Sequence, residues 1–183
     1  MLLEELYAPY RNCTACPLGK LGRINVVFGD GNPDARLMLI GEGPGQKEDE
    51  QGKPFVGRSG ALLNQILHTI GLDRSDIYIS NIVKCRPPLN RTPLPSEMKT
   101  CKELLLEKQI AIIQPRIICT LGSAALQGLC ELPIKITQER GVARMLYNTP
   151  TIPTYHPAYI LRNPTKLPDL LRDLQLAFEL SRQ

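Results

Sequence analysis

Three polar side chains follow apolar runs of the kind that form buried strands. Glu42, Asn81 and His156 each lie at or just beyond the end of such a run. Open parallel sheets bind ligands at the carboxyl ends of their strands, so we expect these residues to share one crevice. There a carboxylate can orient a water, an amide can offer a donor beside an acceptor, and an imidazole can donate a hydrogen bond.

Four of the six cysteines are spaced as metal ligands. Cys13 and Cys16 form a CxxC pair near the N-terminus, and Cys85 and Cys101 form a second, wider pair. Two cysteine pairs can build a tetrathiolate site, but the spacing does not separate zinc from an iron–sulfur cluster. The alternative, buried cysteines without a ligand, is weak for the first pair because it lies among polar residues. A shared metal would tether the N-terminal segment to the proline-rich stretch between the second pair.

The length of 183 residues predicts one domain, spanning residues 1–183. No run of about 18 apolar residues is present, so we expect no membrane span. Glu4 and Glu5 stand where a signal peptide needs a basic flank, so we expect the chain to stay in the cytoplasm. Disulfides are rare there because thiols stay reduced. The other two cysteines, Cys119 and Cys130, lie in apolar runs and are expected in the core.

The net charge of +4 is unevenly distributed. Residues 81–102 carry five basic side chains against Glu97 alone, a surplus equal to the charge of the whole chain. Residues 42–50 carry four acids against Lys47. This distribution predicts a basic rim around an acidic pocket and a mild preference for an anionic partner.

Short apolar runs bounded by turn residues alternate with longer helical patterns, which predicts an α/β fold with a parallel sheet flanked by helices. The expected strands cover 37–40, 77–80, 117–121 and 152–155, with a weaker candidate over 25–28. The expected helices cover 59–70, 96–113 with Ser96 as N-cap, a segment after Ser123, and 168–180.

Together with the cysteines, four motifs occur in a recognisable order along the chain. They are Gly41-Glu42-Gly43-Pro44-Gly45-x2-Glu48-Asp49, Gly52-x-Pro54-Phe55-Val56-Gly57, Asn81-Ile82-Val83-Lys84-Cys85-Arg86-Pro87-Pro88 and His156-Pro157-Ala158-Tyr159-Ile160-Leu161-Arg162-Asn163-Pro164. On these motifs the chain resembles the family 4 uracil-DNA glycosylases.

The resemblance implies a three-layer α/β/α sandwich with a central, mostly parallel four-stranded sheet. It implies a 4Fe–4S cluster whose ligands are Cys13, Cys16, Cys85 and Cys101. It also implies a monomeric DNA-repair enzyme of the prokaryotic cytoplasm and nucleoid. Such an enzyme hydrolyses the bond between uracil and deoxyribose in single- or double-stranded DNA.

The resemblance further implies a role for each polar residue of the crevice. Asn81 would read O4 and N3–H of a uracil that has swung out of the duplex. Phe55 would stack on the base, and Gly43 would let the backbone approach it. His156 would donate a hydrogen bond to O2 of uracil, where negative charge develops as the bond breaks.

Two carboxylates complete the expected catalytic set. Glu42 would position the water that attacks C1′ and would offset the positive character of the sugar. Glu48, further along the same loop, would either orient that water or crowd C5 of the base and so reject thymine.

The loop 156–164 is expected to enter the minor groove and to insert an apolar side chain where the base has left. Basic residues should hold the phosphates, which makes binding salt-dependent. The residues expected to contact DNA are Lys84, Arg86, Arg91, Tyr159, Leu161 and Arg162. For Arg91 the alternative is a solvated surface charge.

Two other functions remain open on the sequence. A non-catalytic, metal-stabilised DNA-binding module would explain the charge pattern but not the polar side chains at three strand ends. A sister glycosylase for another deaminated base would use the same motifs.

Overall fold

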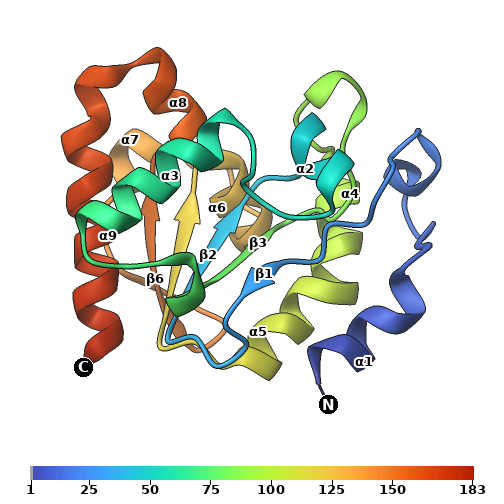
Figure 1. Cartoon of the computed structure of the whole chain (residues 1–183), viewed down its shortest axis with the longest axis horizontal. Helices are drawn as coiled ribbons and strands as arrows, with labels where there is room; N and C mark the ends of the chain where they lie inside the picture. The colour runs from blue at the N-terminus through green and yellow to red at the C-terminus, as the bar shows by residue number, and fades with distance from the viewer. Residues whose placement is uncertain (1) are drawn as a thin grey trace.

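A six-stranded sheet lies at the centre of the computed structural model, which describes residues 2–183 (Figure 1). The strand order is β1-β3-β2-β4-β6-β5. The inner strands are parallel and match the expected runs; they are β2 (Leu37–Gly41), β3 (Tyr78–Asn81), β4 (Ile117–Leu121) and β6 (Thr149–Thr154). The edges are short antiparallel strands, β1 (Asp30–Gly31) and β5 (Arg144–Leu146).

The sheet therefore has two edge strands in addition to the four strands expected. The weaker strand candidate over 25–28 is wrong. In that segment the N–H of Val27 donates to the carbonyl of Lys84 (2.7 Å) outside the sheet. β5 joins β6 through a tight turn at Tyr147 and Asn148, whose φ angles are 51° and 57°. Two successive positive φ angles are typical of a two-residue hairpin, but the turn contains no glycine to reveal it in the sequence.

Successive side chains of β2 face opposite sides of the sheet and meet two helical layers. Met38 and Ile40 pack against one layer, whereas Leu37 and Leu39 pack against the other. The first layer consists of α1 (Leu3–Tyr7), α4 (Pro95–Cys101), α5 (Glu107–Ile113) and α6 (Ser123–Cys130). The second consists of α3 (Arg58–Thr69), α8 (Pro157–Arg162) and α9 (Leu167–Arg182). The α/β/α sandwich is confirmed, and Figure 1 shows α9 and α5 on opposite sides of the sheet.

The helix expected over 96–113 has Leu94, rather than Ser96, as its N-cap. The carboxylate of Glu97 accepts the backbone N–H of Leu94 (2.8 Å), which satisfies this end of the helix without a hydroxyl cap. A π-helical segment, η5 (Lys102–Leu106), joins α4 to α5.

Two segments expected to be loops contain short helices. α2 (Gln46–Gln51) carries Glu48, and α8 occupies most of the segment expected to be the loop 156–164. His156 is the N-cap of α8, and Pro157 is its first residue. Proline is favourable at that position because its missing N–H would have no intrahelical partner anyway.

The remaining short elements are η1 (Ala8–Tyr10), η2 (Pro17–Lys20), η3 (Arg74–Asp76), η4 (Pro88–Asn90), α7 (Ile136–Glu139) and η6 (Pro164–Lys166). Within residues 2–183, none of the helices combines the length and the apolar character needed to cross a bilayer.

Candidate active site

A cleft of about 720 Å³ opens at the carboxyl edge of the parallel strands. Glu42 follows β2, Asn81 ends β3 and His156 follows β6, and all three line this cleft. Glu48 and Phe55 line it as well. The sheet thus brings the three polar residues into one crevice, as their positions at strand ends predict.

Phe55 lies against the imidazole of His156. The two ring centroids are 5.4 Å apart, and the ring planes are inclined by 29°. Phe55 has a φ of 51°, and its carbonyl accepts a hydrogen bond from Arg74 (2.9 Å) that helps to hold this left-handed conformation. A Cβ at Gly41 would lie 2.7 Å from the Phe55 ring and also against Oδ1 of Asn81. Only glycine therefore lets the ring and the amide approach β2 this closely.

Asn81 places an unpaired acceptor at the cleft. The residue is 2% exposed, and its Oδ1 is buried without a hydrogen-bond partner among the described residues. Buried amide oxygens almost always have a donor in native proteins, so this oxygen has the capacity to accept a hydrogen bond from a bound molecule.

His156 has a defined tautomer. Its Nδ1 accepts a hydrogen bond from the backbone N–H of Ala158 (3.0 Å), so a neutral ring carries its proton on Nε2. Burial lowers the pKa of His156 to about 4, while Glu48 raises it and Arg162 lowers it further by smaller amounts. The imidazole is therefore neutral at pH 7 and can donate a hydrogen bond from Nε2.

The two acids of the cleft have different environments. Burial raises the pKa of the Glu42 carboxyl above its usual value, and the Thr92 side chain offsets part of this. The carboxylate of Glu48 is buried, and its Oε1 accepts the backbone N–H groups of Val56 (2.9 Å) and Gly57 (2.8 Å). Glu48 thus fastens the segment that carries Phe55 to α2.

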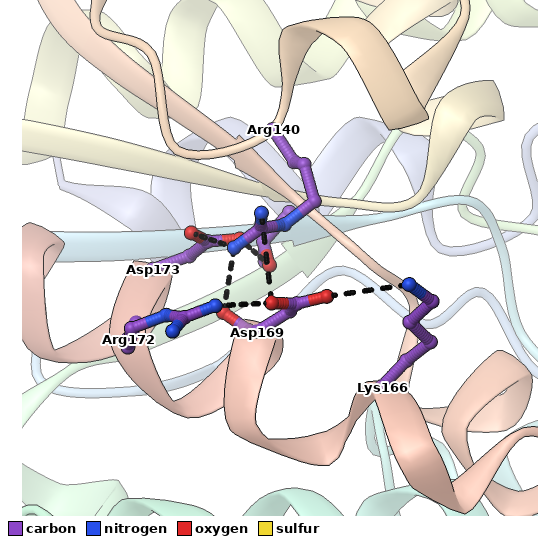
Figure 2. Close-up of polar contacts among 6 residues, drawn as sticks. Arg140, Lys166, Asp169, Arg172 and Asp173 are labelled. Atoms are coloured by element: carbon purple, nitrogen blue, oxygen red, sulfur yellow. Dashed lines mark hydrogen bonds and ion pairs between the residues drawn. The ribbon is translucent and has the colours of Figure 1, made fainter.

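A partly buried ion pair links β6 to α9 through Asp173. The guanidinium of Arg140 binds both carboxylate oxygens of Asp173 (2.6 and 2.9 Å), and the hydroxyl of Thr154 donates to the same carboxylate (2.6 Å). Arg140 also covers the ring of Tyr155, 5.5 Å from its centroid. This pair therefore holds the chain immediately before His156. Figure 2 shows the pair Arg140–Asp173 together with its labelled neighbours Lys166, Asp169 and Arg172.

The four cysteines expected as ligands line one small cavity between the N-terminal segment and α4. They are Cys13, Cys16, Cys85 and Cys101, and all are free thiols. Within residues 2–183 no three His, Cys, Asp or Glu side chains are arranged around a single metal ion, so the thiols surround a cavity rather than one point. Burial raises the pKa of Cys85 to about 12 and that of Cys101 to about 11. Thiolates at these positions need a positively charged partner, which a metal centre supplies.

Comparison with known proteins identifies the family. The description "Uracil DNA glycosylase superfamily" belongs to the family model that matches residues 28–177. The type-4 uracil-DNA glycosylase of Thermotoga maritima is 49% identical over 164 residues, which cover 88% of this chain and 84% of that protein. The protein of the same name from Pyrobaculum aerophilum is 39% identical over 186 residues, covering 97% and 94% of the two chains. The chain belongs to the type-4 uracil-DNA glycosylases. The family expected from the sequence motifs is confirmed.

In a type-4 uracil-DNA glycosylase the residues that contact DNA are expected at the rim of the cleft. Lys84 does not lie there. Lys84 is fully buried and its Nζ donates to groups of the core. The expectation that it contacts phosphate is wrong, because its ammonium has no access to solvent. Burial lowers its pKa to about 7, and Cys101 opposes this change.

The other residues expected to contact DNA differ in their exposure and in the hydrogen bonds that they already make. Arg91 lines the cleft but binds both oxygens of the buried Glu97 (2.7 and 2.9 Å), so its charge balances an internal carboxylate. Arg86 is half-buried, and its Nε donates to Asn90 (2.7 Å). In α8, Tyr159 is half-buried, and the more exposed neighbours are Leu161 (41%) and Arg162.

Several residues of the cleft were not assigned a role from the sequence. They are Ser59, Asn90, Thr92, Ser123, Ile136, Thr137 and Tyr155. Ser123 follows β4, so the rule that ligands bind at strand ends predicts its place in the crevice, though not a role. The segments that carry Asn90, Thr92 and Thr137 have no periodicity or motif from which their position could be inferred.

Proposed function

We propose that the chain excises uracil from DNA by hydrolysing the N-glycosidic bond, and that the cleft holds the base after it has left the duplex. Membership in the type-4 uracil-DNA glycosylases supports the activity. The observation that carries the assignment of the cleft is His156, whose Nδ1 accepts the N–H of Ala158 and whose ring lies against Phe55, in the same cleft as Asn81 with its unpaired amide oxygen. These are the groups that recognition of a uracil and stabilisation of its leaving anion require.

Asn81 reads the base. Its unpaired Oδ1 accepts N3–H of uracil, and its amide nitrogen donates to O4. Cytosine presents a donor and an acceptor in the opposite order, so the same orientation of the amide rejects it. Phe55 stacks on the base, and the backbone at Gly43 lies in the cleft without a side chain that would obstruct it.

His156 and Glu42 stabilise the separated charges. Negative charge develops on uracil O2 as the bond breaks, and a hydrogen bond from Nε2 of His156 is strongest at that moment. Glu42 follows β2 at the same cleft and accepts a proton from the water that attacks C1′. Its carboxylate also offsets the positive character of the sugar.

Glu48 acts by positioning rather than by contacting the attacking water. Its Oε1 is committed to the N–H groups of Val56 and Gly57, and a Cβ at Gly45 would lie only 2.8 Å from Oε2. We propose that Glu48 keeps Phe55 in stacking position, while its negative charge stands close enough to affect His156.

DNA binds over α8 at the rim of the cleft. Leu161 and Tyr159 are the apolar side chains available to fill the space left by the base. Arg162 lines the cleft and is exposed, and Arg86 is partly exposed, so these two residues hold phosphates. We expect the chain to act as a monomer in the cytoplasm.

The donor set of the cysteine cavity is the one that a 4Fe–4S cluster takes. Its donors are four thiols from three segments of the chain. The backbone N–H of Lys84 donates to Sγ of Cys101 (3.3 Å), as N–H groups do around cluster sulfurs. Cys13, Cys16, Cys85 and Cys101 would hold the cluster, which would bond the N-terminal segment to α4 and to the chain after β3. No step of base excision needs to pass through it.

A panel of oligonucleotides tests the function. Each substrate contains a single test base, which is uracil opposite guanine, uracil opposite adenine, unpaired uracil, thymine or hypoxanthine. Alkali then cleaves the strand wherever the enzyme has left an abasic site. We expect cleavage at uracil only. An intact strand at every salt concentration and temperature, despite binding, would indicate a DNA-binding module, and cleavage mainly at hypoxanthine would indicate a sister glycosylase.

A further inference from the structure

Lys84 is the only lysine of the described chain with no exposed surface, and its ammonium is fully hydrogen-bonded. Its Nζ donates to Oγ of Ser80 (2.6 Å), to the carbonyl of Asn81 (2.6 Å) and to Oε1 of Gln109 (2.7 Å). An ammonium has three donors and no acceptor, so these three bonds satisfy it completely. A charge this deep in the core is costly to bury and is tolerated only when it is paired in this way.

The partners of Lys84 are themselves held by further bonds. Nε2 of Gln109 donates to the hydroxyl of Tyr7 (2.6 Å) and to the carbonyl of Phe28 (2.8 Å). Ser80 lies within 3.1 Å of the same carbonyl. Because each polar group in this chain of contacts has a partner, the network holds the ammonium in place.

The network ends at the base-reading residue. Asn81 is the last residue of β3, and Lys84 binds its backbone carbonyl while its side-chain Oδ1 has no partner among the described residues. The hydrogen bond from Lys84 therefore holds the main chain of Asn81, and the side-chain amide stays available to a ligand.

The backbone of Lys84 connects this network to the cysteine cavity. Its N–H donates to Sγ of Cys101 (3.3 Å), and its carbonyl accepts the N–H of Val27 (2.7 Å). Cys85 is the next residue. The position of the Lys84 backbone, and so the reach of its ammonium to Asn81, is set by contacts with the cysteine site.

We propose that Lys84 is a positioning residue that holds Asn81 in the orientation that reads uracil. This inference rests on the proposed role of Asn81 in base recognition. Lys84 touches neither base nor DNA, so it acts only through Asn81.

Lys84→Met tests the proposal because it keeps an unbranched apolar chain as far as Cε and removes all three bonds of Nζ. We expect the single-turnover rate on uracil-DNA and the affinity for free uracil as a product inhibitor to fall together, each by about 10-fold or more, the effect of losing hydrogen bonds to a buried charge. Iron per chain should stay as in the unsubstituted protein, because no thiol is removed.

Lys102→Met is the matched control. Lys102 is also buried and also adjoins a cysteine of the cavity, but its ammonium pairs with Glu131. We expect this variant to lose stability without a change in uracil affinity. An equal loss of uracil affinity in both variants would mean that any buried lysine near the cysteines has this effect, and would overturn the proposal.

A double-mutant cycle with Asn81→Ala separates positioning from general destabilisation. If Lys84 acts through Asn81, its removal costs nothing more once the amide is gone, so the double variant matches Asn81→Ala. Additive losses would refute the proposal. If Asn81→Ala itself kept the normal rate, the role of Asn81 would be wrong, which is a different outcome.

Ser80→Ala keeps the test valid if Lys84→Met does not fold. It removes one of the three acceptors and leaves the ammonium in place. We expect a smaller loss in the same two measurements, again absent in the Asn81→Ala background. An unchanged uracil affinity in a folded Ser80→Ala protein would argue against the network.

Discussion

The backbone N–H of Ala158 donates a hydrogen bond to Nδ1 of His156 across 3.0 Å. His156 is the N-cap of α8, so the helix that begins after this residue also fixes its tautomer. The proton of the neutral ring is thereby directed to Nε2. A local capping contact thus determines which atom of the imidazole can donate to the leaving base.

Replacing His156 by alanine should lower the single-turnover rate on uracil-DNA by about 10²–10³-fold, the usual effect of removing one donor to a developing oxyanion. The matched control is His68→Ala, because His68 is the other histidine of the chain and is exposed on α3. Quench-flow or manual time courses with enzyme in excess measure the rate. A normal rate in His156→Ala would remove this residue from the mechanism.

Stability should depend on the protonation of His156. Its pKa in the folded protein is about 4, whereas a histidine in an unfolded chain titrates near 6.5. Between these values the unfolded state binds more protons, so the contribution of His156 is complete above about pH 6.5 and is lost as the pH falls toward about 4. Urea denaturation across this range should show a smaller decrease in the free energy of unfolding for His156→Gln. The same decrease in both proteins would show that another group titrates.

Much of the site could be predicted because its polar residues follow strands. β2, β3 and β6 have short apolar runs that the sequence displays clearly, and the parallel order then brings Glu42, Asn81 and His156 to one edge. The four sequence motifs predicted the family, and comparison with known proteins confirmed it.

The error at Lys84 has a physical cause, which is that the burial of a charge depends on partners that the folded chain brings to it. Lys84 lies among basic residues and was expected on the surface, but Gln109 and Ser80 pair it in the core. Gln109 lies 25 residues from Lys84, and the local pattern around Lys84 does not reveal it. Arg91 binds Glu97, six residues along the chain, and its contact with DNA stays a prediction.

Gly41→Ala should damage the cleft more than the fold. The new Cβ would lie 2.7 Å from the Phe55 ring and against Oδ1 of Asn81, so both groups must move and uracil affinity should fall by at least about 10-fold, given that base stacking alone contributes about 1–3 kcal/mol. Gly71→Ala is the control. It introduces strain at a φ of 80° but meets nothing within 4 Å, so it should lower the melting temperature and leave uracil affinity unchanged. Equal uracil affinity in the two variants would contradict the assignment of the pocket.

Cys85→Ala should remove the visible absorbance of the purified protein together with stability of the N-terminal segment, because a tetrathiolate site loses one of its four ligands. Cys119→Ala is the control, since Cys119 is also buried but lies in β4 and does not line the cavity. We expect this variant to keep its iron. Its free energy of unfolding should fall by about 1 kcal/mol because the substitution leaves a small cavity. Unchanged iron per chain in Cys85→Ala would refute the proposed ligands.

Arg162→Ala should weaken DNA binding to a similar degree for every sequence, because a phosphate contact carries no information about the bases. Arg162 is exposed at the end of α8 and lines the cleft, so its guanidinium is free to meet the backbone of the strand. The slope of log K against log salt should become less negative by about 0.9 for the lost contact, measured by fluorescence anisotropy with an oligonucleotide that carries a stable abasic analogue. Arg172→Ala provides the comparison, because Arg172 is also exposed but pairs with Asp169 on α9 and does not line the cleft. If both substitutions changed the slope equally, the basic charge of the chain would act as a diffuse field, and α8 would have no special place in the DNA interface.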